Sequence, residues 1–299
     1  MNNSVHGYYS FRMANIKLPN KTWNIKPFGV VVYLTILAIL AAILFLYYFF
    51  CRVSEPFENE PNWLGGIDVI YWINLDRSKD RKKWMEKLLE DPVFQNIPNE
   101  RISAIDGKSP GLVDSLLNIP TKQDGHTDVV YACLLSHLNA IREFSNSSYD
   151  VALIVEDDIC LEFQQYWKNP IKKVIDHAPE DWDIIQLYYF VKDNFLNNEY
   201  TLNVDSEYNS TVAYLINKKG SKKIIDQVYV NNKYKLKMEH PHSADNYLYR
   251  ELTSYVYKYP YITHRTENDS TLHPDHVYTT HVPFKINAIK AFENEIYEK

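Results

Sequence analysis

One stretch limits the architecture of this chain more than any other. Residues 27–51, PFGVVVYLTILAILAAILFLYYFFC, contain no charged side chain, and a helix needs about 20 apolar residues to cross a bilayer. A buried core helix of this length normally keeps a polar face. A cleaved signal peptide has a shorter apolar region followed by small residues, whereas residues 47–50 are bulky. The sequence therefore predicts a transmembrane helix over residues 28–51.

The charges before this run predict its orientation. Four basic residues and no acid precede it: Arg12, Lys17, Lys21 and Lys26. Positive residues usually stay on the cytoplasmic side. We therefore expect a single-pass type II membrane protein, ER- or Golgi-like in a eukaryotic host. Its parts would be a cytoplasmic tail (1–27), a polar stem (52–66) and a lumenal or exterior catalytic domain (67–299).

Composition and cysteine content narrow the class of protein. The 299 residues carry a formal net charge of −6, which disfavours a nucleic-acid partner because such proteins usually present a basic face. Cys51 lies at the predicted membrane edge and could be acylated or have no role. Cys133 and Cys160 could form a disulfide in an oxidising lumen or remain buried thiols.

From residue 67 onward, strand-like and helix-like patterns alternate. Strand patterns occupy 67–75, 100–107, 150–159, 181–190 and the start of 212–229, and helical patterns occupy 78–91, 128–146 and the rest of 212–229. Such alternation predicts an α/β domain with a mostly parallel sheet and flanking helices. Ligands of these sheets bind at the carboxyl ends of the strands.

Three consecutive acids, Glu156, Asp157 and Asp158, stand at one such strand end. Buried carboxylates are costly without a cation, hydrogen bonds or solvent. If the strand continues through them, Glu156 and Asp158 share one face, as ligands of Mg²⁺ or Mn²⁺ beside nucleotide phosphates would. The alternative is a solvated acidic turn. No Gly-rich phosphate loop is present, so a nucleotide would be held by acids, a metal and polar groups.

Seven short segments in order along residues 68–272 resemble glycosyltransferase family 25, which includes lipo-oligosaccharide and procollagen galactosyltransferases. They are VIYWINLDRSKDR (69–81), RISAIDGK (101–108), ACLLSHLNAIREF (132–144), ALIVEDD (152–158), TVAYLINKKGSKKII (211–225), HSADNYLY (242–249) and THRTENDSTL (263–272). Ala132 stands where the family usually has Gly, and Ser243-Ala244 replaces Pro-Val. The resemblance implies a GT-A-like, Rossmann-like catalytic domain.

The resemblance also implies roles for the acids and for the segment after the first strand. Asp158 would be a direct metal ligand supported by Glu156, with Glu156 and Asp157 in the nucleotide-sugar motif. Asn74, Arg77 and Arg81 would lie on the donor side, where arginines can bind diphosphate oxygens bidentately. The alternative for this segment is the start of a helix, capped by Asp76 or Ser78.

Three further donor-side residues come from the same resemblance. Asp106 would lie near the donor nucleotide, although Asp106-Gly107 also reads as a simple turn. Ser136 and His137 lie in the middle of a predicted helix between apolar residues. They are candidates for the donor side, and a histidine in such a place is also often a packing residue.

The general base and the last metal ligand are expected in the C-terminal part. Asp245 is the candidate base that deprotonates the acceptor, and it could equally cap the helix that follows. His281, or else His273, would complete the metal site. The histidines at 264, 273, 276 and 281 lack tight metal-ligand spacing, so surface histidines are the alternative.

Together these observations predict a metal-dependent glycosyltransferase. It would move a hexose, by resemblance galactose, from a UDP-sugar with inversion, using Mn²⁺ or Mg²⁺. The acceptor would be a glycan, a lipid-linked saccharide or a protein hydroxyl. Two other classes stay open: an inactive membrane-anchored carbohydrate-binding protein of the same fold, and a metal-dependent nucleotide-sugar hydrolase.

Overall fold

The computed structural model of the protein describes residues 27–53, 61–265 and 281–297. The chain divides into two compact units, Met1–Asn59 and Glu60–Lys299. We describe each unit by itself.

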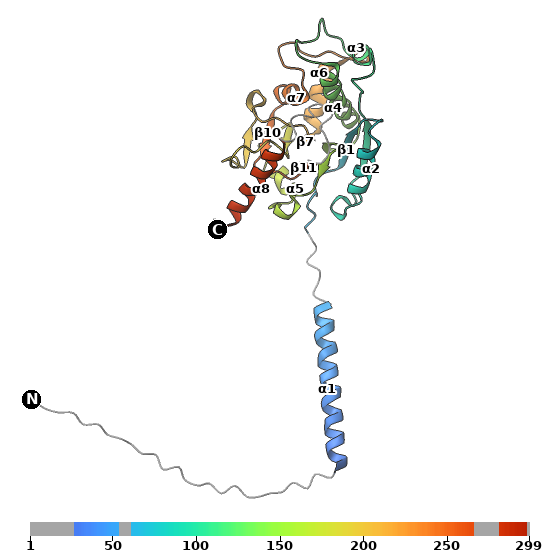
Figure 1. The fold of residues 1–299 in the computed structure, drawn as a ribbon, viewed down its shortest axis with the longest axis vertical. Helices are drawn as coiled ribbons and strands as arrows, with labels where there is room; N and C mark the ends of the chain where they lie inside the picture. Colours follow the sequence, from blue (N-terminus) through green and yellow to red (C-terminus); the bar gives the residue numbers. More distant parts are fainter. Residues whose placement is uncertain (1–26, 54–60, 266–280, 298–299) are drawn as a thin grey trace, which may run out of the picture. The chain divides into compact units, whose positions relative to one another are not determined.

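The first unit contains the helix α1 (Pro27–Val53), shown in Figure 1. The side chains of residues 32–45 are exposed, and the large ones are apolar. Judged on the residues described, no helix combines the length and the hydropathy needed to cross a membrane. The transmembrane helix expected over residues 28–51 is thus not confirmed by the structure and stays a prediction.

The second unit is built on a central sheet. Its strands, within the described ranges, are β1 (Val69–Asn74), β2 (Asn99–Ser103), β3 (Val151–Glu156), β5 (Ile184–Gln186), β6 (Tyr200–Leu202), β7 (Ala213–Asn217) and β10 (Ser254–Tyr257). They lie in the order β2-β1-β3-β7-β5-β10-β6. Strands β2, β1, β3, β5 and β10 run in one direction, while β7 and β6 run against their neighbours. The expected mostly parallel sheet is confirmed.

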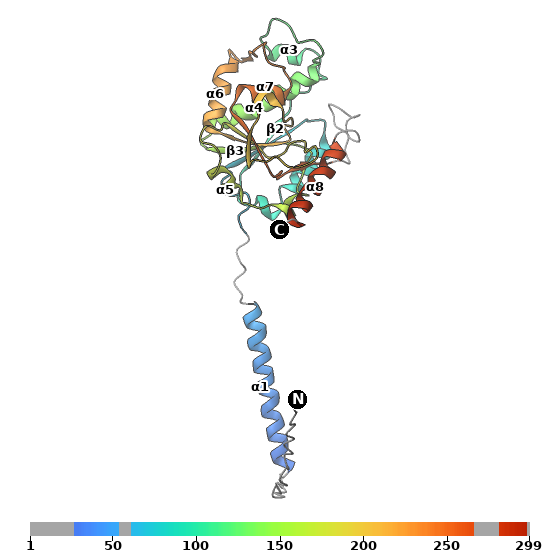
Figure 2. The same cartoon turned by 90° about the vertical axis from the view of Figure 1, so that its left-hand side faces the viewer.

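Helices cover both faces of this sheet. Figure 2 shows α4 (Asp128–Asn146), α6 (Lys218–Val228) and α7 (Ala244–Glu251) on one face, and α5 (Ile171–Asp176) and α8 (Val282–Tyr297) on the other. Within the described ranges, the remaining α-helices and short strands are α2 (Lys79–Leu88), α3 (Leu112–Leu116), β4 (Ile159–Cys160), β8 (Tyr229–Val230), β9 (Lys233–Tyr234) and β11 (Thr263–His264).

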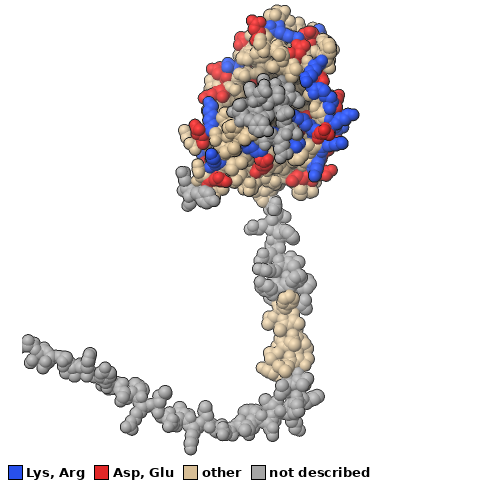
Figure 3. Space-filling view, in the orientation of Figure 1, with Lys and Arg blue, Asp and Glu red and all other residues tan. Residues whose placement is uncertain are grey.

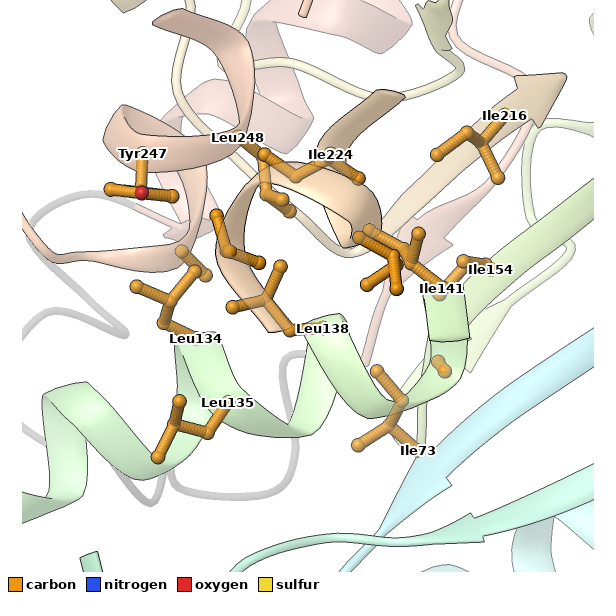
Figure 4. Packing of buried hydrophobic residues seen from close by; sticks show 14 of the residues in the cluster. Ile73, Leu134, Leu135, Leu138, Ile141, Ile154, Ile216, Ile224, Tyr247 and Leu248 are labelled. Atoms are coloured by element: carbon orange, nitrogen blue, oxygen red, sulfur yellow. The ribbon is translucent and has the colours of Figure 1, made fainter. Parts of the chain in front are cut away.

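Helix α4 forms the centre of the larger core because its apolar residues recur at helical spacing. Leu134, Leu138 and Ile141 are fully buried, and Figure 4 shows them facing residues of β1, β3, α6 and α7. Strand β1 serves both cores by alternation, with Ile73 on the α4 side and Trp72 on the other. The sheet and α4 thereby form a rigid base for the strand ends.

The acidic cluster does not continue the strand. Strand β3 ends at Glu156, residues 157 and 158 form a turn, and β4 begins at Ile159. The condition for Glu156 and Asp158 to share one strand face is therefore not met, and each acid has its own environment.

Figure 3 shows basic and acidic side chains interspersed on the visible face of the second unit.

Candidate active site

A pocket opens where the carboxyl ends of three neighbouring parallel strands meet the first turns of α4. Its walls come from the residues that follow β1 and β2, from the end of β3 and from α4. Six of the residues expected in the site line it: Arg77, Arg81, Ser136, His137, Glu156 and Asp157. The structure thus brings together residues that are up to 80 positions apart in sequence.

Asp157 is held entirely by the protein. Its Oδ2 accepts a 2.6 Å hydrogen bond from Asn74, and its Oδ1 accepts one of 2.7 Å from Arg81. Asn74 and Asp157 are 1% and 6% exposed. Asn74 and Arg81 were both expected to bind the donor. In the structure they fix the acidic turn to β1 and α2, and such buried charge-assisted bonds are among the stronger ones.

Asp158 has an unsatisfied oxygen. Its Oδ2 lies 3.3 Å from Arg81, while its buried Oδ1 has no hydrogen-bond partner among the described residues. Burial raises the pKa of Asp158 to about 7; Arg81 opposes the rise, and the charges of Glu156 and Asp157 add to it. A buried carboxylate oxygen without a partner fits a site for a cation, because a cation would supply the missing interaction.

Glu156 stays ionised by a different arrangement. Thr211 Oγ1 donates a 2.9 Å hydrogen bond to its Oε1, and His137 Nε2 lies 3.6 Å from the same oxygen. Burial alone would raise the pKa of Glu156, but the contacts with His137 and Thr211 and the charge of Arg81 bring it below its ordinary value. The surroundings therefore shift the pKa values of Glu156 and Asp158 in opposite directions, a pattern typical of functional sites.

Arg77 and Asp106 pair at the exposed edge of the pocket. Arg77 Nε and Nη2 donate to the two carboxylate oxygens of Asp106 at 2.8 and 3.2 Å. These hydrogen bonds, with one from the Lys108 amide, lower the pKa of Asp106. Both residues were expected on the donor side; Arg77 lines the pocket, and Asp106 pairs with it. In this structure each satisfies the other, so a phosphate oxygen would compete with Asp106 for Arg77.

Ser136 and Gly107 join the loop after β2 to α4. Ser136 Oγ accepts a 2.9 Å hydrogen bond from the Ile105 amide and donates one of 2.6 Å to the Ala132 carbonyl. A Cβ on Gly107 would lie 2.5 Å from Cα of Val129, closer than real side chains approach. Gly107 is thus required by contact with α4, beyond the turn expected from its sequence.

Asp245 lies in the first turn of α7, whose N-cap is Ser243. The alternative role of Asp245 as the helix cap is therefore wrong. Its Oδ1 accepts a 2.8 Å hydrogen bond from the Asn246 amide. Burial raises the pKa of the pocket residue Cys133, and the charges of Glu156, Asp245 and Asp158 add to that rise. The charge of Asp245 and the charges of Glu156 and Asp158 thus act on the same thiol.

The expected third metal ligand has another partner. His281 Nδ1 lies 3.1 Å from His264 Nε2, and no group of three or more His, Cys, Asp or Glu side chains within the described ranges could hold a metal ion. His273 and His276 lie outside those ranges. A cation at Asp158 would therefore take most of its ligands from substrate and water, as Mg²⁺ commonly does.

Sequence reasoning missed two side chains that hold the site. Thr211 and Tyr214 stand just before and within β7 and contact Glu156 and His137. Their segment was recognised as a motif, but a strand pattern gives no sign of which residue meets a distant acid.

Cys133 and Cys160 are free thiols in the structure, so the disulfide considered for them is not formed.

Comparison with known proteins identifies the family. Residues 67–240, more than half of the chain, match the model of the family described as "Glycosyltransferase family 25 (LPS biosynthesis protein)". The chain belongs to glycosyltransferase family 25. The prediction of a glycosyltransferase is confirmed at the level of the family.

The chain matches only part of the length of its individual relatives. The chain is 29% identical over 178 residues to procollagen galactosyltransferase 2 of Homo sapiens and 27% identical over 183 residues to that of Mus musculus. Each match covers 54% of this chain and 28% of the relative. A solved glycosyltransferase involved in glycosylation of the major capsid of PBCV-1 aligns over 71% of this chain and 98% of its own, with 9% identity and a TM-score of 0.32.

Proposed function

We propose that this family 25 chain transfers a hexose from a UDP-sugar to an acceptor hydroxyl, with inversion and with a divalent cation. The observation that carries the proposal is the unpartnered Oδ1 of Asp158 beside a pocket at the carboxyl ends of β1 and β3. The names of the relatives support galactose as the sugar. The acceptor is a glycan, a lipid-linked saccharide or a protein hydroxyl.

In this proposal, different residues bind the donor, hold the acidic turn and bind the cation. Arg77 exchanges Asp106 for a diphosphate oxygen, and Asn74 and Arg81 hold the acidic turn in place. Asp158, with Glu156, would hold Mn²⁺ or Mg²⁺, which supplies neutralisation of the charge that develops on the departing diphosphate. Arg81 already neutralises the charge of Asp157. A cation held by Asp158 and Glu156 would therefore leave no acid of the cluster without a positive partner.

Asp245 serves as the general base in this proposal. The acceptor oxygen forms a bond to the anomeric carbon while the bond from that carbon to UDP breaks, and Asp245 takes the hydroxyl proton. Its Oδ1 is oriented by the Asn246 amide, which leaves Oδ2 for the acceptor.

UDP release by the full chain in detergent tests the proposal. A panel of UDP-sugars is supplied with Mn²⁺ or EDTA, and Asp158→Asn is compared with Asp226→Asn, an exposed control on α6. Cation-dependent release from one donor, redirected by an added acceptor and lost only in Asp158→Asn, supports transfer. Release that no acceptor redirects indicates a hydrolase, and sugar binding without release indicates an inactive binding protein.

We also propose, from the sequence, that residues 28–51 anchor the chain as a type II membrane protein. The charge-free run and the four preceding basic residues support this orientation. Extraction of membranes with alkaline carbonate tests it. An anchored chain stays in the pellet, and a chain that appears in the supernatant refutes the anchor.

A further inference from the structure

A buried chain of polar contacts runs from the sheet to Glu156. The hydroxyl of Tyr214 lies 3.1 Å from His137 Nδ1, and His137 Nε2 lies 3.6 Å from Glu156 Oε1. Thr211 donates to that same oxygen. Tyr214 and His137 are 0% and 1% exposed, so water does not compete for the contact between them. The residues come from β7, α4 and the end of β3.

The chemistry of imidazole determines which ring nitrogen of His137 carries the proton in this series of contacts. A neutral histidine carries its proton on one ring nitrogen and accepts at the other. Burial raises the pKa of Tyr214 well above its ordinary value, with Glu156 and Cys133 adding to the rise, so its hydroxyl keeps its proton. When that hydroxyl donates to Nδ1, the histidine proton lies on Nε2 and faces Glu156. The opposite tautomer would set a lone pair against the carboxylate.

We propose that Tyr214 and Thr211 are positioning residues of the donor site. Tyr214 fixes the tautomer of His137, and His137 and Thr211 together hold Oε1 of Glu156. This leaves Oε2 as the oxygen that Glu156, which lines the pocket, presents to the sugar nucleotide. The inference rests on the proposed function for its kinetic consequence, but the tautomer itself can be tested without any donor.

The tautomer is measured by nitrogen NMR on the full chain labelled with ¹⁵N-histidine, with His137 assigned from its loss in His137→Gln. The wild type should show a proton on Nε2 of His137, and Tyr214→Phe should shift the population toward the Nδ1-protonated form. Tyr200→Phe is the matched control, because the Tyr200 hydroxyl donates to the Val174 carbonyl instead. An unchanged tautomer in Tyr214→Phe overturns the proposal.

Donor turnover gives the second readout. Tyr214→Phe and Thr211→Val should each lower kcat by about tenfold or more, as loss of a supporting partner commonly does, while Thr211→Ser keeps the hydroxyl and most of the activity. Wild-type kcat and KM in Tyr214→Phe would overturn the proposal. If the wild type turns over no donor, the proposed function fails, and the NMR comparison still decides whether Tyr214 sets the tautomer.

Discussion

The side-chain amide of Asn74 donates a 2.6 Å hydrogen bond to Oδ2 of Asp157, joining the last residue of β1 to the turn after β3. The two strands are parallel neighbours, so this bond fixes the turn at the sheet edge. Because Asp157 is occupied in this way, the three acids are not equivalent. Asp157 supports the structure, and its neighbour Asp158 is left with the unsatisfied oxygen.

Asp157→Asn should destabilise the fold. The change weakens the acceptor for Asn74 and leaves the guanidinium of Arg81 with a poorer partner in a buried place, which costs about 1–3 kcal/mol. Urea unfolding of the full chain at pH 7.5 measures the loss. Asp226→Asn, on the exposed surface of α6, should change the unfolding free energy by less than about 0.5 kcal/mol. Equal midpoints for the two variants would contradict the prediction.

Asp158→Asn should stabilise the fold relative to the wild type as pH rises. The pKa of Asp158 is raised to about 7 in the folded protein from 3.8, so the native state keeps a proton that the unfolded state loses. Stability from this group is complete below pH 3.8 and is lost as pH rises toward 7. The Asn variant lacks this loss. In EDTA, the unfolding free energy of the variant minus that of the wild type should be higher at pH 8 than at pH 5 by about 1 kcal/mol or more. A difference that does not change with pH would refute the prediction.

The same pKa predicts how cation binding depends on pH. A cation at Asp158 displaces the proton, so affinity should rise as the carboxyl ionises. With a pKa of about 7, apparent Mn²⁺ affinity should increase about tenfold between pH 6 and pH 8. Titration calorimetry on the full chain, with UDP present, measures the affinity. Flat affinity over this range, or unchanged binding by Asp158→Asn, would place the cation elsewhere.

Glu295 should make stability sensitive to acid. Glu295 lies near the C-terminal end of α8 and pairs with Lys168 and Lys258. Burial would raise its pKa, but hydrogen bonds from Lys168, Lys258 and Tyr259 lower it to about 2. This stabilisation is present above pH 4.5 and is lost as pH falls toward 2. Glu295→Gln should cost about 1 kcal/mol at pH 7 and nothing at pH 2, as judged by thermal unfolding at both values.

Local pattern predicted the elements well and their mutual contacts poorly. The helix expected over residues 128–146 has those bounds as α4, because its apolar residues recur at helical spacing over many turns. The antiparallel direction of β7 could not be predicted, since a fully buried strand is apolar in either direction. The contacts of Asp157 with Arg81 and of Thr211 with Glu156 also depend on the packing of separate elements. The contact of His281 with His264 on β11 depends on such packing as well.

Gly107→Ala tests whether the pocket depends on the approach of the β2 loop to α4. The added Cβ would lie 2.5 Å from Cα of Val129 and 2.6 Å from the carbonyl oxygen of Asp128. Because these two are backbone atoms, the loop or the helix must move, at a cost of about 1–3 kcal/mol. Moving α4 displaces Ser136 and His137, so donor KM should rise. Gly111→Ala is the control: its Cβ would meet nothing within 4 Å, although its φ of +72° adds strain. A raised donor KM in Gly107→Ala alone supports the contact, and equal effects in both variants would attribute the change to general backbone strain.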